Sequence, residues 1–257
     1  MALEESDVGA SDWNSPKVRA AVADLIEAYG RDIFMGDGFA AAGHVIGFGA
    51  DQAFVQTFLG AGPDDNERGW PWRLHSLVWA AKTVLSVPGD FVECGVFRGF
   101  MSLVVCRMLQ FEKIPRTFWL FDTFAGLAAG RSSEQERGAL NDMYDRARQE
   151  GYTHEAVKAK FALYPNVKVV QGVVPDVFAT ACPRRIAYLH IDMNAAEAEV
   201  AALDALFDKV SPGGIVLLDD YGRLDYAHMH AAERQWFRDR GYPVLELPTG
   251  QGLVVKR

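Results

Sequence analysis

The sequence GDFVECGVFRG, residues 89–99, reads as a short buried strand that ends near an acidic residue and is followed by a turn with two glycines. Gly95 and Gly99 let the backbone of such a turn adopt positive φ and approach a ligand closely. An apolar helix is predicted from about residue 100 to 110, and its first N–H groups and positive dipole end would face that ligand. We therefore expect residues 89–99 to bind a nucleotide-type cofactor.

The composition limits the class of protein and its partners. The chain of 257 residues is long enough for one large α/β core. It has no run of 18 apolar residues and no basic N-terminal region before an apolar run, so we expect a cytoplasmic protein. Its three cysteines lack metal-binding spacing, and its net charge of −8 disfavours nucleic acid or an anionic membrane as a partner.

Three regions follow from the order of the patterns along the chain. Residues 1–15 are polar and predicted to be a mobile arm. Residues 16–69 contain a predicted helix at 16–29 and a short one at 51–59 between glycine-rich turns, and we interpret them as an N-terminal helical cap. Residues 70–257 form the main domain, with a charged insertion at about 126–165 in which short helices are expected at 141–150 and 154–163. We interpret this insertion as a lid; the alternative is a solvated connector.

Strand and helix patterns alternate through the main domain. Strands are predicted at 90–94, 117–121, 167–171, 186–191, 214–218, 243–247 and 251–256, and helices at 100–110, 174–180, 195–209 and 225–240. This alternation predicts a doubly wound, Rossmann-like α/β fold with a parallel sheet. The last two strands are joined only by PTG at 248–250, so they must form an antiparallel hairpin. A sheet completed in this way is the class I methyltransferase arrangement.

The cofactor turn differs from a dinucleotide turn. Glu93 stands where a dinucleotide fingerprint needs its first glycine, and a pyrophosphate would meet a carboxylate there. S-adenosylmethionine has a cationic end and no phosphate, so it fits better. Asp122 ends the second strand 23 positions beyond Gly99, where an acidic residue binds ribose hydroxyls. Gly172 ends the third strand, where an adenine edge would lie.

Three carboxylates end two later strands. Asp192 follows one strand, and Asp219 with Asp220 follows the next, so in a doubly wound sheet they meet at one edge. Like charges so close favour a divalent cation, and all-oxygen ligands favour Mg²⁺, or Mn²⁺ or Ca²⁺, over Zn²⁺. The alternative is that these residues only cap helices. His190 and His228 are further candidates for a general base. A histidine within a buried strand, such as His190, more often has a structural role.

Four blocks of the sequence together resemble the macrocin O-methyltransferase (TylF-type) family: DFVECGVFRGF at 90–100, WLFDTFAGL at 119–127, LHID at 189–192 and SPGGIVLLDDYG at 211–222. The resemblance implies a class I enzyme that depends on S-adenosylmethionine and Mg²⁺ and methylates sugar hydroxyls of natural products. It implies that the metal ligands are Asp192, Asp219 and Asp220, with Asp192 also the catalytic base. It implies cofactor contacts at Glu93, Gly95, Gly99, Asp122 and Thr123.

The chain departs from the family pattern directly after Asp192. The family usually has Gly-Asp and then a Tyr, whereas this chain has MNAAE at 193–197. The predicted metal ligands are all present in this chain, but the surface beside them differs from that of the family. The resemblance also suggests a homo-oligomer.

Three functions are therefore compared. The first is an O-methyltransferase acting on a hydroxyl of a small molecule, a sugar of a natural product or glycan. The second is a catechol-type O-methyltransferase, in which the same divalent cation would bind two adjacent phenolic oxygens. The third is a non-catalytic S-adenosylmethionine-binding protein whose carboxylates are only structural.

Overall fold

The computed structural model describes residues 16–30 and 33–257, and the arm predicted at 1–15 lies outside them. The helices within this part of the chain are α1 (Pro16–Tyr29), α2 (Gly47–Ala50), α3 (Gln52–Gly60), α4 (Pro71–Thr83), α5 (Phe100–Leu109), α6 (Glu134–Gln149), α7 (His154–Lys160), α8 (Ala196–Leu206) and α9 (Ala227–Asp239). The strands are β1 (Ile33–Gly36), β2 (Phe39–Ala42), β3 (Asp90–Cys94), β4 (Phe118–Asp122), β5 (Val167–Gln171), β6 (Ile186–Ile191), β7 (Val210–Leu218), β8 (Leu245–Glu246) and β9 (Gly252–Val255). No helix among the described residues is both long and apolar enough to span a bilayer.

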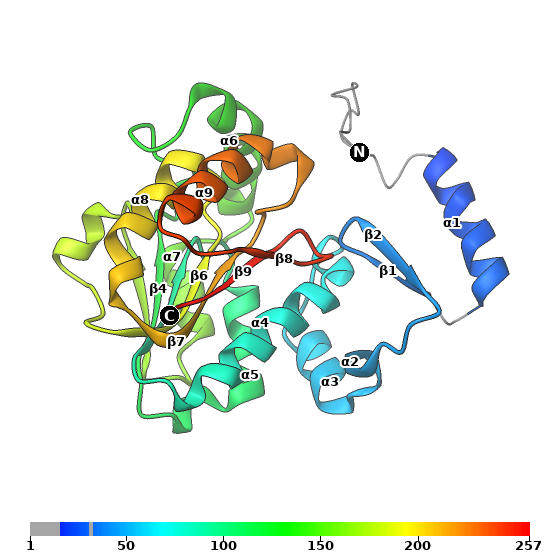
Figure 1. The fold of residues 1–257 in the computed structure, drawn as a ribbon, viewed down its shortest axis with the longest axis horizontal. Coiled ribbons are helices and arrows are strands. Elements are labelled where there is room, and N and C mark those ends of the chain that lie inside the picture. The colour runs from blue at the N-terminus through cyan, green and yellow to red at the C-terminus, as the bar shows by residue number, and fades with distance from the viewer. Residues whose placement is uncertain (1–15, 31–32) are drawn as a thin grey trace.

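Seven strands form the central sheet, in the order β5-β4-β3-β6-β7-β9-β8. The strands from β5 to β7 pair in parallel, and β9 pairs antiparallel with both β7 and β8. The sequence predicted this doubly wound sheet and its closing antiparallel hairpin, and both predictions are confirmed (Figure 1).

Helices cover both faces of the sheet, and each face has its own apolar core. Residues of α4 and α5, such as Leu77 and Val104, pack with Phe91 and Tyr188 on one face. Residues of α8 and α9, such as Leu203 and Phe237, pack on the other. The strands between them are buried on both faces, which explains why β6 is buried along its whole length.

The register of the parallel strands brings the predicted site together. Cys94 pairs with Ile191, and Ile191 pairs with Leu218, so these three strands end side by side. Gly95, Asp192 and Asp219 are the next residues along each strand and therefore lie next to one another at the carboxyl edge.

One element of the N-terminal region is missing from the sequence-based prediction. Residues 33–42, expected to be glycine-rich turns, form the antiparallel hairpin β1–β2. Asp37 and Gly38 make its two-residue turn with φ of 50° and 80°, as an Asp-Gly turn favours. The alanines of β2 have low β propensity and conceal this signal. The hairpin lies between α1 and the main body (Figure 1).

The predicted bounds of two other elements are wrong. The helix expected at 141–150 begins at Glu134, because Ser133 and Glu136 form a capping box that starts α6 seven residues earlier. The helix expected at 174–180 is a single 3-10 turn at Asp176–Ala179.

Candidate active site

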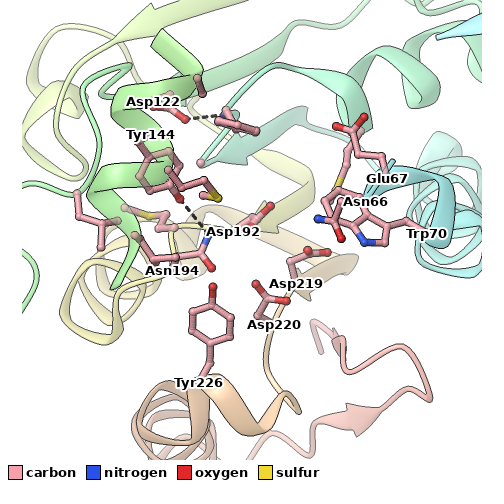
Figure 2. A pocket seen from close by; sticks show the side chains of 18 of the residues that line it. Asn66, Glu67, Trp70, Asp122, Tyr144, Asp192, Asn194, Asp219, Asp220 and Tyr226 are labelled. Atoms are coloured by element: carbon pink, nitrogen blue, oxygen red, sulfur yellow. Dashed lines mark hydrogen bonds between the residues drawn. The ribbon is translucent and has the colours of Figure 1, made fainter. Parts of the chain in front are cut away.

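A cavity of about 1500 Å³ lies at the carboxyl edge of the sheet. The strand ends, α6 and the β1–β2 hairpin contribute to its lining, as do Asp122, Asp192, Asp219 and Asp220 (Figure 2). A pocket for one small molecule typically measures about 300–1000 Å³, so this cavity has room for a cofactor together with a second substrate.

The turn after β3 has the backbone that its glycines predicted. Gly95 has a φ of +88°, and a Cβ there would lie 1.7 Å from the carbonyl oxygen of Asp192. Gly99 has a φ of +71° and is the N-cap of α5. Only glycine therefore fits position 95, where two strand ends meet.

Asp122 holds this turn in place. Its Oδ2 accepts from the backbone N–H groups of Val96, at 2.6 Å, and Phe97, at 2.8 Å. Its Oδ1 accepts from the N–H of Phe124 at 2.7 Å. A carboxylate has about four acceptor positions, so Asp122, which lines the cavity, retains one for a ligand hydroxyl.

The other residues predicted to bind the cofactor divide into two groups. Gly95, Thr123 and Gly172 line the cavity beside Asp122. Glu93 and Gly99 are not among the lining residues in the described part of the chain. Glu93 is buried on the α5 side of β3, where Ser102 donates to it. Its carboxylate therefore lies away from the cofactor position that the sequence suggested.

The carboxylates after β6 and β7 lie together, and Arg73 of α4 contacts two of them. Arg73 Nη1 donates to Asp219 Oδ2, and it donates to Asp220 Oδ1 at 3.1 Å. The same guanidinium donates to both oxygens of Asp37, at 2.8 and 3.0 Å. Arg73 thus joins the N-terminal hairpin to the carboxylates.

The surroundings of each carboxylate set its pKa. Burial raises the pKa of Asp192 well above its usual range, and the charges of Asp219 and Asp220 raise it further. Burial acts on Asp219 in the same direction, but the charge of Arg73 and the hydrogen bond from His190 lower its pKa below the usual range. Burial also raises the pKa of Asp220, against the charge of Arg73, so Asp219 is the carboxylate of the three that ionises most readily.

His190 lies behind the cavity and is fully bonded. Its Nδ1 lies 2.9 Å from Glu93 Oε1, and its Nε2 lies 3.3 Å from Asp219 Oδ1. Burial alone would lower the pKa of His190, but the hydrogen bonds to Asp219 and Glu93 raise it to about 10. His190 is therefore a protonated, structural residue at neutral pH.

His228 lies apart from the carboxylates. Its Nε2 lies 2.8 Å from Glu136 Oε1, and it is not among the described residues that line the cavity. Of the three bases that the sequence suggested, Asp192 alone lines the cavity and is not already paired with an opposite charge.

The side chains also offer a group of atoms for a cation. One ligand atom each from His190, Asp192 and Asp219 lies within 4.8 Å of the others. This group shares Asp192 and Asp219 with the predicted set and has His190 in place of Asp220. Because both nitrogens of His190 already bond to carboxylates, the oxygens of the predicted set are the better donors.

Several residues of the site are absent from the sequence-based prediction: Asp37, Arg73, Tyr144, Asn194 and Tyr226. Arg73 had a usable signal, because it lies four residues before Leu77 and so continues the buried face of α4. The others lie in the turn and segments that cover the cavity. Local patterns do not show which residues of such segments point inward.

The comparison with known proteins agrees with this geometry. The family model described as Macrocin-O-methyltransferase (TylF) matches residues 71–241. A tetracenomycin 4'-O-methyltransferase of Streptomyces olivaceus, which acts on a 2,3-dimethoxy-α-L-rhamnosyl compound, is 29% identical over 188 residues, or 65% of this chain and 72% of the relative. The mycinamicin III 3''-O-methyltransferase of Micromonospora griseorubida is 28% identical over 193 residues, or 70% and 76%.

Two solved structures are similar in fold. The O-methyltransferase NovP has a TM-score of 0.59 and 25% identity, over 72% of this chain and 79% of NovP. The calicheamicin methyltransferase CalS11 has a TM-score of 0.57 and 18% identity, over 97% and 99%. The family match covers more than half of the chain and includes the cofactor turn and all three carboxylates. The chain therefore belongs to the macrocin O-methyltransferase (TylF) family and is an S-adenosylmethionine-dependent O-methyltransferase with the class I fold.

Proposed function

We propose that this enzyme methylates a sugar hydroxyl of a natural product, and that it uses a divalent cation held by Asp192, Asp219 and Asp220. The observation that carries the proposal is the meeting of these three carboxylates in one cavity with the cofactor turn. The relative from Streptomyces olivaceus supports a glycoside as the acceptor, since its name describes a rhamnosyl compound.

The charges around the carboxylates support a divalent cation. Five carboxylates meet there, and their only cationic partners among the described side chains are Arg73, Arg223 and His190. The carboxylates are Glu93, Asp37, Asp192, Asp219 and Asp220. When all five are ionised and His190 is protonated, two negative charges remain, which is the charge that one Mg²⁺ would balance.

Asp192 is the proposed general base. It lines the cavity and forms no ion pair with the described side chains, so it is the carboxylate best placed to take a proton from an acceptor hydroxyl. A bound cation would favour ionisation of the acceptor hydroxyl and fix its position. Asp192 would accept the hydroxyl proton, and the oxygen would take the methyl group of S-adenosylmethionine, which would leave as S-adenosylhomocysteine.

The proposed cofactor position follows from the residues beside the turn. Asp122 would bind one ribose hydroxyl through its remaining acceptor position, with Thr123 next to it and Gly172 at the adenine edge. Gly95 would lie against the methionine portion, and Gly99 would shape the start of α5. Glu93 acts through Ser102 and His190 and not by direct contact.

Calorimetric titration and methyl transfer test this proposal. We expect the D192N and D219N variants to bind S-adenosylmethionine with wild-type affinity and to lose at least a hundredfold in methyl transfer. The exposed D176N variant is the control. Chelation with EDTA should abolish transfer and added Mg²⁺ should restore it. Transfer that survives both D219N and EDTA would contradict the metal, and transfer only to catechols would favour the catechol-type alternative.

A further inference from the structure

Asn194 contains an unusual unsatisfied atom beside the proposed base. Its Oδ1 is buried and has no hydrogen-bond donor within the part of the chain that the structure describes. A buried amide oxygen without a donor is costly, and such groups are rare in folded proteins. Asn194 lines the cavity next to Asp192, so a ligand that displaces the side chains covering this atom can supply the missing donor.

The orientation of the Asn194 amide is fixed by its partners. Its Nδ2 lies 3.3 Å from Asp192 Oδ1 and 3.4 Å from the Tyr144 hydroxyl. Because Nδ2 donates to Asp192 Oδ1, the amide oxygen faces away from that carboxylate. Asn194 Oδ1 is therefore held as a free acceptor.

The backbone beneath this side chain is fixed as well. Asn194 has a φ of +56°, a conformation that asparagine tolerates better than most residues. Glu199 Oε1 of α8 accepts from the N–H groups of Met193, at 2.9 Å, and Asn194, at 3.0 Å. These contacts hold the Asn194 side chain in one position beside the cavity, as a ligand-binding residue requires.

A hydroxyl donor also faces this position. Figure 2 shows the Tyr226 hydroxyl pointing toward Asn194 from the segment before α9, opposite the Tyr144 hydroxyl. An acceptor at Asn194 and a donor at Tyr226 together match a ligand hydroxyl, which both donates and accepts.

The position lies close enough to Asp192 for one sugar to reach both. The two heteroatoms of an amide are about 2.2 Å apart, so Asn194 Oδ1 lies within about 5.5 Å of Asp192 Oδ1. Hydroxyls on neighbouring carbons can each reach one of these oxygens with a hydrogen bond of about 2.8 Å.

We propose that Asn194 and Tyr226 bind a second hydroxyl of the acceptor, on the carbon next to the one whose oxygen is methylated. This inference rests on the proposed function, and it adds that the enzyme selects an acceptor with two adjacent free hydroxyls. Asn194 is then a specificity-determining residue, acting on the choice of acceptor and not on the proton transfer.

The test uses a panel of 4-nitrophenyl glycosides of L-rhamnose, L-fucose and D-glucose, with S-adenosylmethionine and Mg²⁺. Mass spectrometry and NMR assign the methylated position on the best acceptor. A matched acceptor then has the neighbouring hydroxyl replaced by hydrogen. We expect wild-type kcat/KM to fall roughly tenfold or more on this deoxy acceptor.

The variants separate recognition from a structural role. In the N194A variant the ratio of kcat/KM on the diol to kcat/KM on the deoxy acceptor should fall by the same factor. Loss of the hydrogen bond to Asp192 acts on both acceptors alike, so this ratio is the readout, and the melting temperature reports the cost of alanine at a φ of +56°. The N194D variant keeps an oxygen acceptor and should keep a preference for the diol. Equal loss on both acceptors, or equal wild-type rates on both, would overturn the inference while the proposed function stands. No transfer to any glycoside, with S-adenosylmethionine still bound, would remove the sugar acceptor and this inference with it.

Discussion

Arg73 and Asp37 form a two-point ion pair, in which Nε donates to Oδ2 at 2.8 Å and Nη2 donates to Oδ1 at 3.0 Å. Both side chains are buried, and the same guanidinium also bonds to Asp219 and Asp220. Arg73 therefore neutralises part of the charge of the catalytic carboxylates and attaches the β1–β2 hairpin to these carboxylates. The N-terminal cap and the reaction centre are consequently coupled through Arg73. Arg223, at 3.2 Å from Asp37 and 3.7 Å from Asp220, makes a second and more exposed connection.

The R73M variant should lose about 3–5 kcal/mol of stability, because it leaves buried carboxylates without their partner. Thermal unfolding measures this loss of stability. Mg²⁺ should raise the melting temperature more in R73M than in the wild type, because the variant leaves more negative charge unbalanced. The control is R68M, whose pair with Asp65 is long, at 3.9 Å, and exposed. An R73M variant that melts like the wild type would contradict the proposed role.

A double variant tests the coupling of the cap. If Asp37 acts mainly through Arg73, then D37N and R73M together should cost clearly less than the sum of their separate effects. Additive effects would show that the hairpin is held by other contacts.

Gly95 should tolerate no side chain. In the G95A variant the new Cβ would overlap the carbonyl oxygen of Asp192, at 1.7 Å, on a backbone with a φ of +88°. We expect loss of at least 3 kcal/mol of stability, or no folded protein, because backbone atoms cannot move aside easily. Gly130 is the control, since a Cβ there meets no atom within 4 Å. Soluble yield and thermal melting of G95A and G130A measure the difference, and equal melting would contradict the predicted overlap.

Asp122 should affect cofactor affinity through the turn it holds. The D122A variant leaves the N–H groups of Val96, Phe97 and Phe124 without their acceptor, and we expect roughly a tenfold to hundredfold weaker affinity for S-adenosylmethionine. Asp90, at the opposite end of β3, accepts from Thr117 N and Trp119 Nε1 and serves as a matched control. Titration calorimetry should show weaker binding in D122A but not in D90A. Equal affinity in both variants would exclude Asp122 from the cofactor site.

The residues that the sequence could predict differ from the others in how their positions are determined. Asp192 and Asp219 end neighbouring strands of a recognisable sheet, and the register alone brings them together. Arg73 meets Asp37 and Asp219 across 36 and 146 residues of chain, and only the docking of the hairpin decides that contact. Local periodicity identifies the framework of such a site but not the residues that separate segments bring to it.

Glu233 of α9 should make stability depend on pH. Burial raises the pKa of Glu233 to about 7; the side chain of Glu199 in α8 acts in the opposite direction, and the charge of Asp220 raises it further. A carboxyl whose pKa is higher in the folded than in the unfolded protein binds more protons when folded. Its contribution is therefore complete below the unfolded pKa, near 4.5, and is lost as the pH rises through about 7.

The E233Q variant should remove this dependence, because the amide resembles the protonated acid and does not titrate. Urea unfolding at pH 5, 6, 7 and 8 should show that the stability of E233Q relative to wild type increases between pH 5 and 7 by up to about 1.4 kcal/mol per pH unit, and levels off above pH 7. Comparing the two proteins at each pH cancels the titration of all other groups. The exposed carboxyl variant E112Q should run parallel to wild type. If E233Q also runs parallel to wild type, Glu233 is already ionised in the native protein at pH 5, and its burial between α8 and α9 must be compensated by another charge.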